Sequence, residues 1–291
     1  MKAQGIGICE WALPTPLRGP LVCRVLKDLG LAAVELKLGT VEENFPLANR
    51  YTLDLYKEEQ AKYGTVFTGI AVNLTDFYAM TAPLGSSDRE MVEYALRSAV
   101  DAAQYLGAPL IHVPSLHALK SEVRTGEGLK NTAEMQLRQL ELVDRENYGI
   151  YFDTQNPHAL NGLGAPSLIE PIFNHIPEFH IKDGFDQIST HLIGEGSCDP
   201  FRSLAEFDRL GYTGWIILES YFWRVPLCQR GDDPYALLRR DLDTVRTWLT
   251  ATPDTSKFFC PSQQFLIPFS AQKRPRHFSM AGLCPARFSI L

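Results

Sequence analysis

The sequence predicts an α/β fold, a TIM-type (β/α) barrel that is incomplete by one unit. The chain has 291 residues and 45% of them are hydrophobic, which suits a single large barrel domain. Through residues 1–250, apolar runs alternate with helical patterns, as they do when helices join the strands of a parallel sheet. The apolar runs are nearly continuous, as expected for strands that are covered on both faces.

The first part of the chain predicts four strands separated by three helices. Each helix is followed by a glycine that ends it, and a Ser-Ser-Asp sequence at residues 86–88 caps the third helix. The expected strands are 5–9, 32–38, 65–74 and 109–113, and the expected helices are 19–29, 51–63 and 88–106.

The second part predicts three further strands, each followed by a helix. The expected strands are 148–153, 178–182 and 214–219, and the expected helices are 166–174, 200–210 and 233–249. Gly211 ends the middle helix. Residues 1–250 are therefore expected to form the barrel domain.

One strand of an eight-stranded barrel is missing from this pattern. A barrel unit takes about 30 residues, and the 40 residues from His112 to Phe152 leave room for one unit and a longer loop, but not for two. Residues 126–147 have a helical pattern with no β-branched run. We therefore expect seven strands, or an open seam near residues 115–147.

Residues 251–291 differ in composition from the rest of the chain. They hold five basic residues and one acidic residue, and they are interrupted by five prolines. No period of 3.6 or 2.0 residues is evident there, so we expect an irregular basic C-terminal tail that adds little to the core.

The net charge and the cysteine content indicate which partners and which cell compartment to expect. The net charge of −6 argues against a surface built to bind nucleic acid. The six cysteines are scattered without a C-x-x-C pair, which is typical of reduced thiols in the cytosol. The N-terminus has no apolar stretch typical of a signal peptide, and no apolar run is long enough to span a membrane. We expect a cytoplasmic protein with no membrane partner. The sequence is compatible with a homo-oligomer.

Three successive strands of the second part end in a polar side chain. These are Asp153, His180 and Glu219, and side chains at the C-terminal ends of barrel strands line the mouth. One such residue alone is usually a cap or a hydrogen-bond partner within a loop. Three of them together form a plausible oxygen, nitrogen and oxygen ligand set for a divalent cation.

The strings YFDTQN, FHIKDG and IGEGSCDPFRSLAEFDRLGYTGWIILES, with AAVELKL earlier, carry a resemblance. They resemble the sugar phosphate isomerase/epimerase family of the xylose isomerase-like TIM barrel superfamily. Members hold Mn²⁺, Co²⁺, Mg²⁺ or Zn²⁺ with Glu, Asp, His and Glu from four successive strand ends. The resemblance implies that Asp153, His180 and Glu219 are the second, third and fourth of these metal ligands.

The first ligand of that family, a Glu that ends the fifth strand, has no counterpart here. Glu134, Glu141 and Glu146 lie in the gap, but in helical or loop patterns. The resemblance implies a metal-dependent isomerase or epimerase of a sugar or sugar phosphate, which moves a proton through an enediolate with Glu219 as one base. Loss of the first Glu would impair it. An inosose-type dehydratase and a non-catalytic barrel relic or small-molecule binding module are the alternatives.

Four more residues are expected to contact a carbohydrate substrate: His158, Trp11, Glu35 and Lys182. His158 is as compatible with a solvated loop, Trp11 with edge packing, and Glu35 with a hydrogen bond inside the barrel mouth. Glu195 is expected to brace a loop at the mouth.

Overall fold

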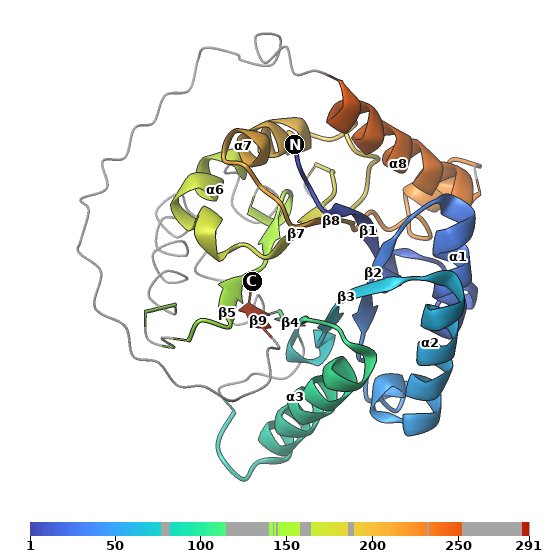
Figure 1. The fold of residues 1–291 in the computed structure, drawn as a ribbon, viewed down its shortest axis with the longest axis vertical. Coiled ribbons are helices and arrows are strands. Elements are labelled where there is room, and N and C mark those ends of the chain that lie inside the picture. Colours follow the sequence, from blue (N-terminus) through green and yellow to red (C-terminus); the bar gives the residue numbers. More distant parts are fainter. Residues whose placement is uncertain are drawn as a thin grey trace.

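In the computed structural model, parallel strands form a ring and helices lie outside it (Figure 1). The structure describes residues 1–76, 82–114, 140–141, 143, 145–157, 164–185, 189–231 and 233–251, and the backbone of residues 287–290.

The strands and helices alternate along residues 1–250 as the sequence predicts. The strands are β1 Gly5–Cys9, β2 Ala33–Lys37, β3 Val66–Ala71, β4 Leu110–Val113, β5 Tyr148–Ile150, β6 Phe152–Asp153, β7 Glu178–Ile181, β8 Trp215–Leu218 and β9 Arg287–Ile290. The helices are α1 Val22–Leu29, α2 Arg50–Tyr63, α3 Ser87–Leu106, α6 Pro166–Ile172, α7 Pro200–Arg209 and α8 Pro234–Thr250.

Two helices show how the local sequence determines where a helix begins and ends. Helix α3 begins after Ser86, whose hydroxyl oxygen accepts a hydrogen bond from the Arg89 amide, and it ends at Gly107, whose φ of 75° lies in the left-handed region that glycine adopts without strain. Helix α1 begins at Val22, later than expected, because 3-10 turns that contain Pro16 and Pro20 occupy residues 15–21.

The strands form one sheet in the order β5-β9-β4-β3-β2-β1-β8-β7-β6, and every pair in it is parallel. Strands β5 and β6, which stand at the two ends of this order, are separated along the chain by Tyr151 alone. They therefore occupy one strand position, and the sheet closes on itself.

The described part of residues 1–250 supplies seven strand positions, which confirms the prediction of an incomplete barrel. The gap lies between β4 and β5. Residues 115–139, in which a further strand was not expected, lie outside the described residues.

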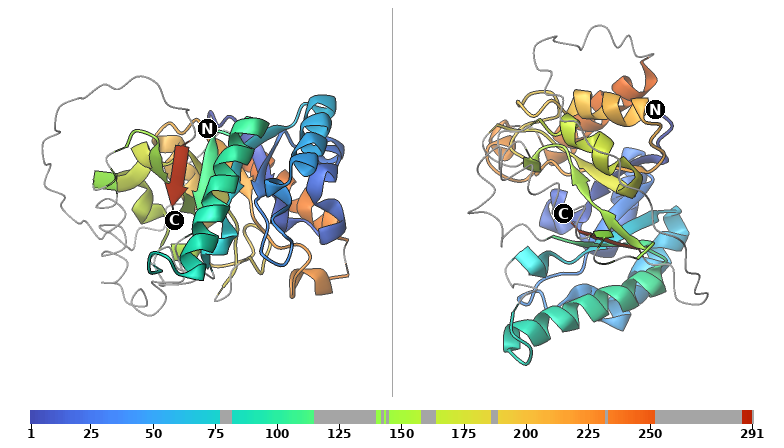
Figure 2. Two further views of the ribbon diagram at one scale, coloured as in Figure 1. Left: turned by 90° about the horizontal axis from the view of Figure 1, so that it is seen from below. Right: turned by 90° about the vertical axis from the view of Figure 1, so that its left-hand side faces the viewer.

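Strand β9, from the end of the chain, lies in this gap. It pairs in parallel with β4 on one side and β5 on the other, with Ser289 opposite both His112 and Gly149. Figure 2 shows β9 as a short red strand beside the green β4. The tail that the sequence predicts to be irregular thus contains one strand; residues 252–286 lie outside the described residues.

Strand β7 shows how residues divide between the two faces of the sheet. Phe179 points outward and stacks on Phe207 of α7, with ring centroids 4.0 Å apart and planes 4° from parallel. Tyr212 packs edge-on against Phe179 at 5.2 Å. Because side chains alternate along a strand, Glu178 and His180 point into the barrel instead, and both are fully buried.

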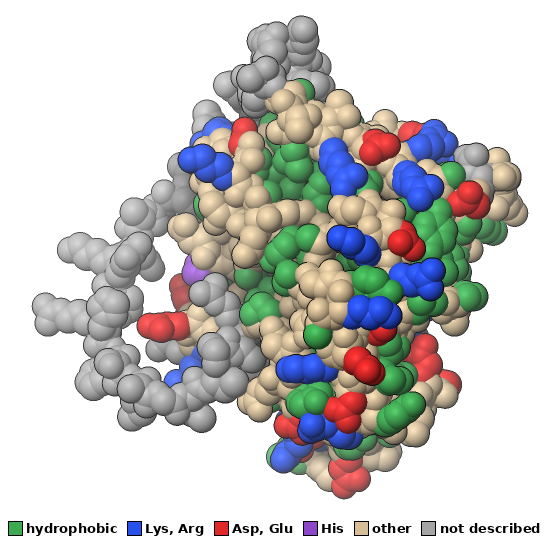
Figure 3. All heavy atoms as spheres, turned by 45° about the vertical axis from the view of Figure 1, so that its right-hand side comes forward, with side chains coloured by type: hydrophobic (Ala, Val, Ile, Leu, Met, Phe, Trp, Pro, Cys, Tyr) green, Lys and Arg blue, Asp and Glu red, His purple; other side chains and the backbone are tan. Residues whose placement is uncertain are grey.

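In the part of the chain that the structure describes, no helix is both long and apolar enough to cross a membrane. On the face drawn in Figure 3, basic and acidic side chains are interspersed with apolar ones, so neither sign of charge dominates this face.

Candidate functional site

Asp153, His180 and Glu219 meet at the C-terminal ends of three neighbouring strands. Asp153 ends β6, His180 lies in β7 and Glu219 directly follows β8. Their ligand atoms lie within 4.8 Å of one another: His180 Nδ1 is 3.1 Å from Glu219 Oε2 and 3.7 Å from Asp153 Oδ2. All three side chains are buried, so the barrel mouth gathers two carboxylates around one imidazole nitrogen.

The turn after β6 fixes the orientation of Asp153. Its Oδ1 accepts hydrogen bonds from the backbone amides of Gln155 at 2.8 Å and Asn156 at 2.7 Å. Its Oδ2 lies 2.8 Å from the Lys182 ammonium. Burial opposes charge on Asp153, but the positive charge of Lys182 keeps its pKa below the ordinary value. Asp153 is thus an ionised carboxylate with one oxygen directed into the site.

Glu219 is held in the same way, with one oxygen fixed and one directed inward. Its Oε1 accepts a hydrogen bond from Trp11 Nε1 at 2.8 Å and another from the Tyr221 hydroxyl at 3.3 Å. Its Oε2 faces His180 Nδ1 and the Lys182 ammonium. Burial opposes its ionisation, but Lys182 and His180 lower the pKa of Glu219 well below the ordinary value.

Lys182 lies between these two carboxylates. Its ammonium forms ion pairs with both Asp153 and Glu219, and the side chain is buried. Burial opposes the charge, but the two carboxylates raise the pKa of Lys182 above its ordinary value. Lys182 therefore neutralises the pair in this arrangement, and its predicted contact with substrate stays a prediction.

The donor set of this site fits a divalent cation. Asp153 Oδ2, His180 Nδ1 and Glu219 Oε2 are directed to one place, and the ion pair with Lys182 is the contact that a cation would replace at Asp153 Oδ2. Two carboxylates and one imidazole suit Mg²⁺, Mn²⁺, Co²⁺ or Zn²⁺. The same three residues would hold the ion, with the Lys182 ammonium displaced from between the carboxylates.

Glu35, in β2, is also fully buried. Its Oε2 is 2.7 Å from His180 Nε2 and accepts a hydrogen bond from the Tyr151 hydroxyl at 3.0 Å. Its Oε1 is 3.0 Å from His112 Nδ1. Burial would raise its pKa, but His180 and His112 lower it to about 2. Both oxygens of Glu35 are thus occupied by protein groups, which supports a role inside the mouth over a substrate contact.

Two buried residues near the site were not anticipated. Cys9, the last residue of β1, has its Sγ 3.1 Å from His180 Nε2. Glu178 lies in the barrel interior with neither carboxylate oxygen hydrogen-bonded, and burial together with the charge of Glu35 raises its pKa to about 8. Strand periodicity would have identified Glu178, because residues two apart share a face; nothing in the sequence distinguishes Cys9.

Comparison with known proteins identifies the fold family of this barrel. Residues 121–247 match the family model described as Xylose isomerase-like TIM barrel. The chain has a xylose isomerase-like TIM barrel fold. This confirms the resemblance drawn from the strings around Asp153, His180 and Glu219. A comparison with curated proteins gave no match.

Solved structures with the same fold align with most of this chain and with nearly all of their own chains. A xylose isomerase domain protein from Planctomyces limnophilus is 17% identical, with a TM-score of 0.58 over 85% of this chain and 96% of that one. D-psicose 3-epimerase from Clostridium cellulolyticum, with D-tagatose, is 14% identical, with a TM-score of 0.63 over 84% and 99%. A probable 3-DHS dehydratase from Bacillus anthracis is 12% identical, with a TM-score of 0.53 over 83% and 98%.

In this xylose isomerase-like barrel, no acidic residue occupies the strand position between β4 and β5. Strand β9 contributes Arg-Phe-Ser-Ile there. Glu141 and Glu146, considered as replacements for the missing ligand, are exposed at the surface, and Glu134 lies outside the described residues. The described residues therefore include three of the four ligand positions that the resemblance implies, and their role as metal ligands stays a prediction.

The carboxylate of Asp183 organises the loop that follows β7. Asp183 accepts hydrogen bonds from the amides of Gly194 at 2.9 Å and Gly196 at 3.0 Å, so the aspartate of FHIKDG organises the GEG turn. Glu195 forms ion pairs with Arg230 at 2.5 Å and Arg240 at 3.4 Å, in line with the bracing role expected for it. His158, expected to contact substrate, lies outside the described residues.

Proposed function

We propose that this protein is a metal-dependent isomerase acting on a sugar or sugar phosphate. The observation that carries the proposal is the convergence of Asp153, His180 and Glu219 at one buried place in the mouth. Structural neighbours that are named as sugar epimerases support a carbohydrate substrate. A bound divalent cation would supply polarisation of the substrate carbonyl, which lowers the cost of removing a neighbouring proton.

The side chains around the candidate metal site would carry out proton transfer, orientation of the base and substrate binding. Glu219 would take the carbon-bound proton and return it, because it is ionised and directed inward. Trp11 and Tyr221 hold its other oxygen and so set its direction. Lys182, once displaced from between the carboxylates, would donate a hydrogen bond to a substrate oxygen.

The missing fourth ligand favours isomerisation over epimerisation. Isomerisation moves a proton between neighbouring carbons on the same face of an enediolate, which one base can do. Epimerisation returns the proton to the opposite face and needs a second base there. The strand position that would supply it holds no acidic residue, so epimerase activity of this chain would be impaired.

The test is proton exchange with solvent. Protein loaded with Mn²⁺ would be incubated in D₂O with a panel of ketoses and their phosphates, and deuterium incorporation followed by NMR. We expect deuterium beside the carbonyl and slow aldose formation, both abolished in Glu219→Gln. Glu195→Gln, a change in the bracing loop outside the ligand set, is the control that keeps activity.

Other results of the exchange experiment would indicate other functions. Loss of water from the substrate, without isomerisation, would indicate the dehydratase. Efficient inversion at the carbon beside the carbonyl would show that a second base is present. Binding of Mn²⁺ and sugar with no exchange would make the protein a non-catalytic binding module, and the isomerase proposal would be wrong.

A further inference from the structure

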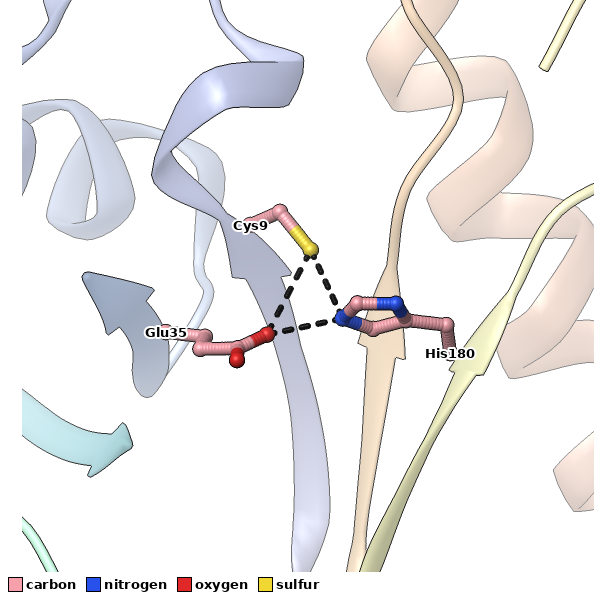
Figure 4. A group of neighbouring side chains, drawn as sticks. All are labelled: Cys9, Glu35 and His180. Carbon is pink, nitrogen blue, oxygen red and sulfur yellow. Dashed lines mark hydrogen bonds and ion pairs between the residues drawn. The ribbon is translucent and has the colours of Figure 1, made fainter. Parts of the chain in front are cut away.

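His180 presents two different ligand sets to its two ring nitrogens. Nδ1 faces the carboxylates of Asp153 and Glu219, whereas Nε2 faces Cys9 and Glu35. Figure 4 shows the second set, in which the side chains of β1, β2 and β7 point toward one another. This set contains a thiol, which the first set lacks.

We propose that Cys9, Glu35 and Nε2 of His180 form a second cation site, selective for a thiophilic divalent ion such as Zn²⁺. This site does not depend on the isomerase proposal, because it rests on different atoms and predicts a different metal preference. A thiolate ligand favours Zn²⁺ and Co²⁺ over Mg²⁺ and Mn²⁺.

The distances within this set are close to those of a zinc site. Cys9 Sγ is 3.1 Å from His180 Nε2 and 3.7 Å from Glu35 Oε2, and the two latter atoms are 2.7 Å apart. With zinc–ligand bonds of about 2.0–2.3 Å in tetrahedral geometry, neighbouring ligand atoms are roughly 3.3–3.6 Å apart. Only the separation between Nε2 and Oε2, now a hydrogen bond, must widen by more than about half an ångström.

The charge and burial of these groups suit a resident cation. Cys9, Glu35 and His180 are all at most 1% exposed, and a buried carboxylate is stable only with positive partners. On zinc binding the Cys9 thiol releases its proton to solvent, and Nε2 of His180 binds as the nitrogen of a neutral imidazole. The ion's two positive charges then balance the thiolate and the carboxylate.

Neighbouring side chains hold the Glu35 carboxylate of this set in position. Glu35 Oε1 lies 3.0 Å from His112 Nδ1, and the Tyr151 hydroxyl donates to Oε2. His112 and Tyr151 stack on each other with ring centroids 4.0 Å apart. Partners of this kind fix the orientation of a ligating carboxylate and strengthen metal binding.

Cobalt absorption tests the proposal without any measurement of activity. Co²⁺ would be added to the folded chain and, because the set is buried, also during refolding from denaturant. A thiolate ligand gives an intense charge-transfer absorption in the near ultraviolet. We expect this absorption in the wild type and in Asp153→Asn/Glu219→Gln, and its loss in Cys9→Ala.

Cys23→Ala is the matched control, because Cys23 is a free buried cysteine in α1, away from the set; it should keep the absorption. Far-ultraviolet circular dichroism checks that each variant folds. Cobalt binding without the absorption, or absorption that survives in Cys9→Ala, would overturn the proposal. So would a wild type that binds no cobalt by either route, in which case Glu35 only orients His180.

Discussion

Replacement of Asp241 by asparagine should make the protein more stable above neutral pH and leave it nearly unchanged in acid. Asp241 lies in α8 and is fully buried. Its Oδ1 accepts a hydrogen bond from the Ile193 amide and its Oδ2 from the Ser220 hydroxyl, both at 2.7 Å. Burial, with the negative charges of Glu195 and Asp183, raises its pKa to about 7 despite these two bonds.

The sign of the effect follows from proton linkage. Between the ordinary pKa of 3.8 and the folded-state value of about 7, the folded protein binds more protons at Asp241 than the unfolded chain does. Stability from this group therefore falls as pH rises through that window. At about 1.4 kcal/mol per pH unit, the loss reaches on the order of 4 kcal/mol above pH 7.

Asparagine removes this loss because it stays neutral at every pH. Its oxygen can still accept from the Ile193 amide, and its amide group can donate to the Ser220 hydroxyl oxygen. We expect the free energies of unfolding of Asp241→Asn and wild type to agree within about 1 kcal/mol near pH 4 and to differ by several kcal/mol near pH 8.

Urea unfolding from pH 4 to 8 measures this difference. Asp243→Asn, an exposed position on the same helix, is the control and should show the same difference from wild type at both ends of the range. A stability difference for Asp241→Asn that does not change with pH would refute the reasoning, because it would place the pKa of Asp241 near its ordinary value.

Three further predictions follow from packing and from the site. Phe207→Ala, which removes the ring stacked on Phe179, should cost about 3–5 kcal/mol in the free energy of unfolding; a cost under about 1 kcal/mol would contradict the described core. His180→Ala should remove most bound divalent metal after dialysis against a trace of chelator, since both ligand sets use it, while exposed His175→Ala should change nothing. Truncation after Ala251 removes β9 from between β4 and β5 and should lower the melting temperature by several degrees; an unchanged melting temperature would restore the initial expectation of a dispensable tail.

The regular part of the barrel could be predicted because each unit carries its own local pattern. Strands such as Trp215–Leu218 are short apolar runs, and helices such as Ser87–Leu106 have a polar cap at one end and a glycine at the other. Strand β9 could not be predicted, because four residues in a proline-rich tail show no periodicity. Its pairing depends on a gap that exists only after the other strands have assembled.

The same distinction applies to the site. Asp153 and Glu219 could be predicted because they are polar residues at the ends of apolar strands. The contact of Cys9 and Glu35 with His180 could not, because it joins three strands across the barrel and a thiol at a strand end resembles any other small buried residue. The alternation of faces along a strand also predicts that Lys182 points inward with His180, two residues before it.

The place of β9 has a consequence for synthesis of the chain. The pair of Ser289 and His112 joins residues 177 positions apart, so β4 and β5 are both synthesised well before the strand that lies between them. Until then, β4 and β5 present unpaired backbone edges, which in other proteins recruit foreign strands. Closure of the ring must therefore await synthesis of β9, so the nascent barrel passes through an open stage during which chaperone capture or aggregation competes with completion of the sheet.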